Sequence, residues 1–235
     1  MNEMSPCKLL LLAALGAAVN LNAQTVTLNT ATYSDGSTYM SWSPTAYTIA
    51  NFPGNGGSGS GGWSLAALPA IISGGNLNLS PNVNAYAPGT VYWTNPDGTG
   101  ANQMDAAAYT ETTGVYFNTS LTFTFDVLAN TLAASAVGGG YTADAFIKDF
   151  GPGYSYNGEV TVPLTPGVDS VTYSLLGNNP GEIVQYGFEI IGPDANPATV
   201  ASLGSVTIAP VPEPTTLALA GLGGLAILVA ARRRK

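Results

Sequence analysis

Alternation of hydrophobic and polar residues predicts a series of β-strands in the second half of the chain. The clearest strand is 121–127, Leu-Thr-Phe-Thr-Phe-Asp-Val, which places Leu, Phe, Phe and Val on one face and Thr, Thr and Asp on the other. Turn-forming segments rich in Gly, Pro or Asn separate it from similar segments. These segments predict further strands at 141–150, 159–164, 171–176, 182–191 and 205–209.

Two of these segments also predict how their residues are placed. In 182–191, four hydrophobic residues are expected to face the core, while Gln185 and Glu189 are expected to face water. The four are Val184, Tyr186, Phe188 and Ile190. Pro163 lies inside 159–164, and because proline cannot donate a hydrogen bond to a neighbouring strand, this segment is expected at the edge of a sheet.

The first half of the chain has a less regular pattern. It predicts strands at 37–49, 76–79 and 90–93. Residues 54–62 contain six glycines in nine positions and predict a flexible loop. Residues 24–210 have a suitable length for one domain, and they show no internal repeat and no heptads. The sequence therefore predicts an all-β fold, an antiparallel β-sandwich of jelly-roll type. The order of its segments resembles that of carbohydrate-binding modules with this architecture.

The first 23 residues have the pattern of a secretory signal peptide. Lys8 precedes an apolar run from Leu9 to Val19, and small or polar residues follow as far as Ala23. About eleven apolar residues are too few to span a membrane. Cleavage is expected after Ala23, with Ala18 as the alternative. The expected partners of this segment are the Sec translocon and signal peptidase.

The last 25 residues, 211–235, contain three elements in a fixed order. A Pro-Glu-Pro tripeptide is followed by the uncharged stretch 215–231 and then by a basic cluster. As a helix, seventeen residues span about 25 Å, enough for a thin hydrocarbon core with the cations on the cytoplasmic side. The tripeptide is Pro212, Glu213 and Pro214, and the basic cluster is Arg232, Arg233, Arg234 and Lys235.

This C-terminal arrangement resembles the PEP-CTERM sorting sequence of exported proteins in Gram-negative bacteria that make exopolysaccharide. The resemblance implies that an exosortase, a membrane-embedded transpeptidase-like enzyme, processes the chain, and that Pro212, Glu213 and Pro214 are the residues it recognises. The chain would first be anchored in the membrane by 215–231 and would then reach the cell surface or the extracellular matrix.

Composition and charge exclude several functions. The chain has no histidine and one cysteine, Cys7, which rules out a Ser-His-Asp triad, a zinc finger and an internal disulfide. Residues 24–210 contain one basic residue, Lys148, against twelve acidic residues. Because binding to nucleic-acid phosphates requires clustered cations, nucleic acid is not an expected partner.

Glycan binding is the leading hypothesis for residues 24–210. Sugar rings stack on aromatic side chains and their hydroxyl groups require polar partners. The candidate glycan-binding residues are Trp63, Asn76, Asn78, Tyr92 and Trp93. The alternative for Trp93, and also for Trp42, is a place in the hydrophobic core, because large aromatic side chains dominate small cores.

Two oxygen-rich turns, 95–100 and 193–197, are compared with calcium sites. Each places carboxylate and carbonyl oxygens in a tight turn, although neither has the spacing of an EF-hand and both also fit ordinary turns. A calcium ion is the only cofactor considered. A polysaccharide-cleaving enzyme would need two placed acids, for which Glu159, Glu182 and Glu189 are candidates.

The sequence predicts an exported envelope or extracellular-matrix protein sorted by exosortase, with a non-catalytic ectodomain that binds exopolysaccharide. The alternatives are a structural or adhesive surface protein without a specific ligand, and a polysaccharide-cleaving enzyme.

Overall fold

The computed structural model describes residues 22–34, 36–133, 140–175 and 180–211. Nearly all of the predicted signal peptide, the Pro-Glu-Pro tripeptide, the stretch 215–231 and the basic cluster lie outside these residues. Within them, no helix has both the length and the apolar character that crossing a membrane requires.

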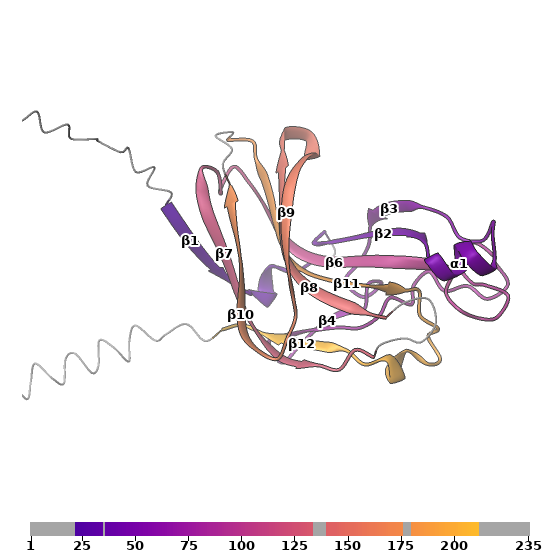
Figure 1. Cartoon of the computed structure of the whole chain (residues 1–235). Coiled ribbons are helices and arrows are strands. Elements are labelled where there is room, and N and C mark those ends of the chain that lie inside the picture. Colours follow the sequence, from indigo (N-terminus) through magenta and orange to yellow (C-terminus); the bar gives the residue numbers. More distant parts are fainter. Residues whose placement is uncertain (1–21, 35, 134–139, 176–179, 212–235) are drawn as a thin grey trace, which may run out of the picture.

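The described residues form two six-stranded β-sheets (Figure 1). The first sheet contains β1 (Asn22–Thr27), β4 (Ala70–Ser73), β5 (Asn76–Leu79), β7 (Thr119–Asn130), β10 (Gly167–Leu175) and β12 (Val206–Ala209). The second sheet contains β2 (Thr38–Pro44), β3 (Gly59–Gly62), β6 (Asn102–Thr113), β8 (Thr142–Gly151), β9 (Ser155–Pro163) and β11 (Ile183–Pro193). The helical elements are α1 (Ala46–Asn51) and three short 3-10 turns, η1 (Thr30–Thr32), η2 (Pro152–Tyr154) and η3 (Val200–Leu203). The predicted β-sandwich is confirmed.

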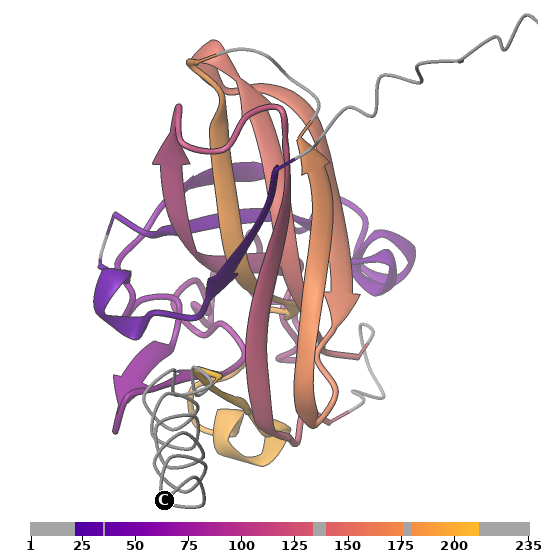
Figure 2. The ribbon, with the colours of Figure 1, turned by 90° about the vertical axis from the view of Figure 1, so that its left-hand side faces the viewer.

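Within the part of the chain that the structure describes, all pairs of named strands except one are antiparallel. The second sheet has the order β3-β2-β6-β11-β8-β9. In the first sheet, β10 covers one edge of β7 from Thr119 to Val127, and β12, β5 and β4 follow on the other edge. The exception is β1, which pairs parallel to β7 at 119–124, next to the stretch that β12 occupies (Figure 2). The first and last strands therefore share one edge of β7 and lie end to end.

The position of β1 bears on the expected signal-peptide cleavage. Cleavage after Ala23 would leave the mature chain starting at Gln24, and Gln24–Thr27 pair with Leu121–Thr124 of β7. The ordered sheet thus begins at the predicted cleavage site, and a chain cut there keeps four of the six residues of β1.

The core lies between the two sheets and is centred on three phenylalanines. Phe123 and Phe125 of β7 pack against Phe188 of β11, with ring centroids 5.2 Å apart in both contacts with Phe188. All three side chains are fully buried. The alternation that predicted strands 121–127 and 182–191 therefore directs these residues into one core.

Most predicted strands of the second half are confirmed, with shifted ends. The strand predicted at 159–164 is β9, which lies at the edge of the second sheet as Pro163 indicated. One prediction within 182–191 was wrong. Gln185 and Glu189 point away from the core, but they are only 8% and 4% exposed because side chains from neighbouring strands cover them.

The first half departs further from the predictions. Only 38–44 of the predicted strand 37–49 is extended, because Thr45 caps α1 by accepting a hydrogen bond from the Thr48 amide at 3.0 Å. The predicted strand 90–93 is a turn, closed by the Trp93 amide on the Thr90 carbonyl at 3.1 Å. The predicted flexible loop 54–62 contains β3, which pairs with β2.

Candidate functional site

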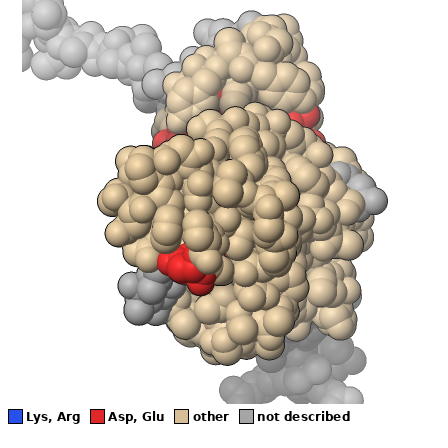
Figure 3. All heavy atoms as spheres, turned by 90° about the vertical axis from the view of Figure 1, so that its right-hand side faces the viewer, with Lys and Arg blue, Asp and Glu red and all other residues tan. Residues whose placement is uncertain are grey.

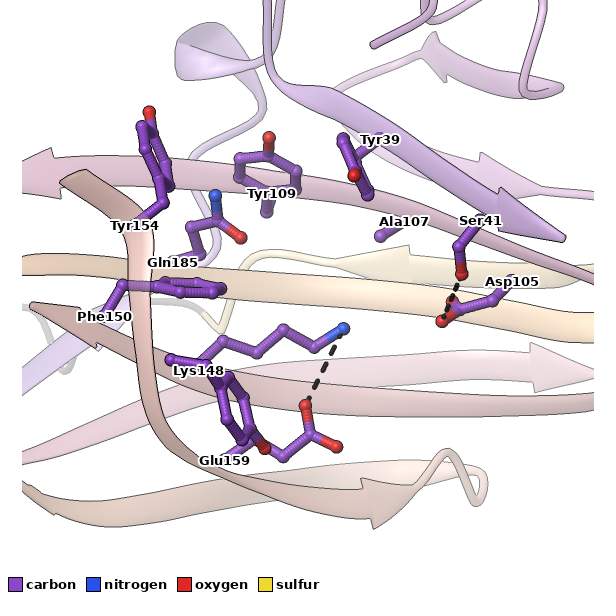
Figure 4. A pocket seen from close by; sticks show the side chains of 11 residues that line it. Tyr39, Ser41, Asp105, Ala107, Tyr109, Lys148, Phe150, Tyr154, Glu159 and Gln185 are labelled. Atoms are coloured by element: carbon purple, nitrogen blue, oxygen red, sulfur yellow. Dashed lines mark hydrogen bonds and ion pairs between the residues drawn. The ribbon is translucent and has the colours of Figure 1, made fainter. Parts of the chain in front are cut away.

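The outer face of the second sheet contains a cleft of about 580 Å³, which is hereafter called the tyrosine cleft (Figure 4). Its volume falls in the range of small-molecule binding sites. Because side chains alternate along a strand, β6 directs Asp105, Ala107 and Tyr109 outward and Met104 and Ala106 inward. Side chains of five strands and of η2 line the cleft: Tyr39, Ser41, Asp105, Ala107, Tyr109, Lys148, Phe150, Tyr154, Tyr156, Glu159 and Gln185.

Three tyrosines expose large parts of their rings at the cleft. Tyr39 is 44% exposed, Tyr154 56% and Tyr156 60%. Tyr154 has a positive φ of 61° and follows Gly153 at 71°, so two consecutive residues adopt the left-handed conformation. A non-glycine residue rarely adopts this conformation, and such residues occur frequently at binding and catalytic sites. The tight turn in η2 is therefore what brings the Tyr154 ring to the cleft.

Glu111 connects the exposed rim of the cleft to its floor. Its Oε1 accepts a hydrogen bond from the Tyr154 hydroxyl at 2.8 Å, and its Oε2 accepts one from Gln185 Nε2 at 2.7 Å. On the opposite side, the Tyr39 hydroxyl donates to Ser60 Oγ of β3 at 2.7 Å. These bonds hold two of the exposed rings in fixed orientations, which lowers the entropy lost when a ligand stacks on them.

The floor of the cleft carries a buried cluster of charges. Lys148 Nζ lies 2.8 Å from Glu189 Oε2 and 4.0 Å from Glu159 Oε2. It also lies 4.2 Å from the centroid of the Phe146 ring. The Glu189 side chain is 5% exposed, so this ion pair is largely removed from water.

Burial changes the protonation of these groups. Burial and the nearby charge of Asp105 raise the pKa of Glu189 to about 7, and Lys148 opposes this shift. Burial also raises the pKa of Asp105. Burial would lower the pKa of Lys148, but attraction to Glu189 raises it above its ordinary value. Lys148 therefore stays cationic, while Glu189 changes its charge near neutral pH.

The five residues predicted to bind glycans lie at two separate places. Trp63 and Trp93 pack against the same hydrophobic cluster, and the Tyr92 ring contacts the Trp93 ring at a centroid distance of 4.6 Å. Asn76 and Asn78 lie on β5 of the first sheet, where Thr207 Oγ1 donates to Asn78 Oδ1 at 2.9 Å. The three aromatic residues are thus together, but the two asparagines are not beside them.

The tryptophans of this region pack against the core, whereas Tyr92 is 39% exposed. Trp42, Trp63 and Trp93 pack against a second hydrophobic cluster made of Met40, Leu68, Ala85, Met104 and Ala106. A Cβ on Gly57 would lie 2.1 Å from the Tyr92 ring, and one on Gly59 would lie 2.5 Å from the Trp42 ring. The glycine-rich segment is therefore packed against these rings, because only glycine allows the backbone to approach so closely.

Two of the three acids considered for catalysis lie at the tyrosine cleft. Glu159 and Glu189 flank Lys148, whereas Glu182 lies just before β11, at the opposite end of that strand from Pro193. Sequence reasoning did not identify the tyrosines of the cleft, since they come from separate strands. Lys148 could have indicated the position of the cleft in the sequence, because it is the one basic residue of 24–210.

The surface elsewhere offers little charge. On the face shown in Figure 3, acidic side chains appear in a few separate places among uncharged residues, and no atom of a described Lys or Arg is visible.

The two turns compared with calcium sites lie next to each other. The Asp194 amide donates to the Asn102 carbonyl at 2.8 Å, and Gly100 approaches the Asp194 backbone so closely that a Cβ would lie 2.1 Å from its carbonyl oxygen. Asp97 in the first turn accepts hydrogen bonds from Thr99 and from the Tyr47 hydroxyl. No group of three or more Asp, Glu, His or Cys side chains suited to a metal occurs among the described residues.

Comparison with known proteins identifies the C-terminal segment. Residues 210–235 match the PEP-CTERM protein-sorting motif. Comparisons with curated proteins and with solved structures give no significant match. The chain therefore carries a PEP-CTERM motif, which is the signature of an exported protein sorted by exosortase, and the resemblance of its last residues to this family is confirmed.

Proposed function

We propose that this exported chain with a PEP-CTERM motif is a surface or extracellular-matrix protein whose ectodomain binds a neutral polysaccharide in the tyrosine cleft. The observation that carries the proposal is the presence of three exposed tyrosine rings, two of them held by hydrogen bonds, around a floor of hydrogen-bonding groups. Apolar faces of sugar rings stack on aromatic rings, and sugar hydroxyl groups bond to Gln185, Glu159 and Asp105.

The strand order supports a jelly-roll assignment for the ectodomain. Strands β5-β12-β7-β10 form one antiparallel sheet and β6-β11-β8-β9 the other, so that successive strands mostly alternate between sheets. This is the arrangement of an eight-stranded jelly roll, to which β1 and β4 add on one sheet and β2 and β3 on the other. The added β2 contributes Tyr39 and Ser41 to the cleft.

Charge favours a neutral polymer as the ligand. The cleft contains one cation, Lys148, against Asp105, Glu159 and Glu189. An anionic chain entering it would meet net negative charge at short range. For a neutral polysaccharide, the unfavourable free energy of binding comes only from displacing water from the rings and polar groups.

The same charges favour binding over cleavage. Glycoside hydrolysis requires one acid that gives a proton to the leaving oxygen and a second that acts on the other side of the bond. Glu189 is buried beneath the cleft and its Oε2 is bonded to Lys148, so it is not placed to reach a substrate. The ectodomain is therefore proposed to act without catalysis.

Replacing a cleft tyrosine should weaken binding to a neutral glucan. Tyr154→Ala and Tyr156→Ala should each lower the affinity about three- to tenfold, since one aromatic contact contributes on the order of 1 kcal/mol. The measurement is equilibrium binding of a neutral glucan and of an alginate to the chain purified in detergent. Alginate, which is anionic, should bind much more weakly.

The matched control is Tyr92→Ala, which removes an exposed tyrosine outside the cleft and tests the aromatic group predicted from the sequence. It should leave binding unchanged. Loss of binding in Tyr92→Ala but not in Tyr154→Ala would move the site to the group with Trp63 and Trp93. Binding to neither polymer would favour a structural or adhesive role, and release of reducing ends would establish an enzyme.

A further inference from the structure

Asp194 is a buried carboxylate for which the described residues supply no hydrogen-bond partner. Its residue is 2% exposed, and neither Oδ1 nor Oδ2 has a hydrogen-bond partner. It follows β11 directly, at the end of the sandwich that carries α1 (Figure 1). The tyrosine cleft does not include it, so the proposed function leaves this group unexplained.

The amide donors around Asp194 are already in use. The Ala195 amide donates to the Asn82 carbonyl at 2.8 Å. Asn82 Nδ2 donates to the Ala67 carbonyl at 3.3 Å, and Asn102 Nδ2 donates to the Tyr92 carbonyl at 2.9 Å. Nearby, the Tyr141 hydroxyl donates to the Pro193 carbonyl at 2.9 Å rather than to the carboxylate. If one of these groups donated a hydrogen bond to the Asp194 carboxylate instead, the carbonyl that it now bonds would be left unpaired.

Ion pairing within the described chain cannot neutralise Asp194 either. Residues 24–210 contain one basic residue, Lys148, and its ammonium group is hydrogen-bonded to Glu189. An isolated ionised carboxylate in a buried site is costly, so it takes up either a proton or a cation. Burial raises the pKa of Asp194 to about 8, against a partial lowering by the Ala195 amide. A protonated carboxyl group would still carry an O–H group without an acceptor, whereas a cation gives both oxygens a partner.

The surroundings are rich in neutral oxygen atoms. Thr94 Oγ1 is buried and also has no partner, and Thr94 pairs through its backbone with Gly100, the residue in close contact with the Asp194 backbone. The Asn102 and Asn82 carbonyl oxygens lie beside the Asp194 backbone, since they accept hydrogen bonds from the Asp194 and Ala195 amides. The chain has no histidine to offer, so the donor set consists of carboxylate, hydroxyl and carbonyl oxygens, which suits calcium.

We propose that Asp194 is the anionic ligand of a calcium site formed where the turn 94–102 meets the segment 193–197. Hydroxyl and carbonyl oxygens of these two segments, with Thr94 Oγ1 among them, supply the neutral ligands. Bound calcium joins the loop that follows β11 to the loop that precedes β6, and so stabilises the end of the sandwich.

Calcium should raise the melting temperature of the full chain, purified in detergent and freed of metal with a chelator. At about a hundred times the dissociation constant, the expected rise is about 5 to 10 °C. Magnesium at the same concentration should give a clearly smaller rise, because it demands octahedral geometry and gives up its water reluctantly. Titration calorimetry should find one calcium ion of high affinity per chain.

Two variants with the same change in charge test the assignment to Asp194. Asp194→Asn should lose the calcium-dependent rise, and without calcium it should melt above the parent chain, because the buried charge has been removed. Asp169→Asn, on β10 of the first sheet and outside both segments of the site, should keep the full rise. The pair controls for general attraction of calcium to an acidic protein.

Several results would overturn the proposal. One is a melting temperature of the parent chain that calcium does not change. Another is a calcium-dependent rise that persists in Asp194→Asn. If Asp194→Asn fails to fold, calorimetric titration of the parent chain and of Asp169→Asn still tests the proposal, because absence of a stoichiometric calcium ion in both would exclude the site.

Discussion

Lys148→Met should destabilise the ectodomain by about 3–5 kcal/mol at about pH 8, since it leaves a buried carboxylate without its cation. Lys148 Nζ lies 2.8 Å from Glu189 Oε2, and the two side chains are 17% and 5% exposed. Methionine keeps most of the contact of the lysine stem with Phe146, so the loss reflects charge more than packing. The loss of stability is measured as the difference in the free energy of unfolding between the parent chain and the variant, obtained from urea titration.

The effect should depend on pH in a defined direction. The pKa of Glu189 rises from 4.5 to about 7 on folding, so the folded state holds the extra proton between these values. The stability gained from this proton is complete below the unfolded pKa and is lost as the pH rises through the folded pKa. Removing Lys148 raises the folded pKa further, because Lys148 lowers it. The loss caused by Lys148→Met should therefore be small near pH 5 and complete only well above pH 7.

Two further variants separate charge from packing. Adding Glu189→Gln to Lys148→Met should restore most of the stability at about pH 8, since no buried charge then remains unpaired. Glu159→Gln, at 4.0 Å from Lys148 and with a side chain 41% exposed, should change stability by less than about 1 kcal/mol. An equal loss in Lys148→Met at both pH values would show that contact with Phe146, and not the ion pair, is what matters.

Replacing Pro212, Glu213 and Pro214 with alanine should abolish sorting almost completely. Two prolines fix an extended backbone and remove two amide donors, which presents a strand that a protease-like cleft can read. Alanine removes this restriction, although the hydrophobic stretch 215–231 and the basic cluster remain. The unprocessed chain should stay in the membrane fraction. Mass spectrometry of the C-terminus and cell fractionation measure the outcome.

The control for this change is a pair of substitutions beside the tripeptide, Thr215→Ala with Thr216→Ala, which should be processed normally. A strain without exosortase should give the same unprocessed chain as the alanine variant. Normal processing of the alanine variant would mean that the three residues are not what the enzyme recognises, even though residues 210–235 match the motif.

The strictly alternating strand β7 could be predicted from the sequence, whereas β6, with both faces covered, could not. β7 alternates between buried and partly exposed residues along most of its length, so its pattern is visible without the partner strands. β6 contains Ala106, Ala107 and Ala108 in succession, all at most 7% exposed. Small residues are needed there because both faces of β6 are covered, and three alanines give no periodic signal and have low strand propensity.

The aromatic residues of the candidate site could not be identified from the sequence either. The sequence suggests three aromatic residues as a binding site because they lie near a glycine-rich segment or near each other along the chain. These are Trp63, Tyr92 and Trp93. Whether a ring faces water depends on what packs on it, and here the glycine backbone packs closely against the Tyr92 and Trp42 rings. Tyr39, Tyr109, Tyr154 and Tyr156 have no such local signal, yet they gather around one cleft.

The sequence by itself determined the C-terminal sorting motif, the all-β class and the strands of the second half, since each depends on residues close together along the chain. The tertiary structure alone decided the tyrosine cleft, the ion pair of Lys148 with Glu189 and the isolation of Asp194. These depend on strand register and on loop contacts between residues tens to more than a hundred positions apart. Alternation along the sequence predicts which face of a strand a side chain occupies. Only the pairing of strands determines which side chains become its neighbours.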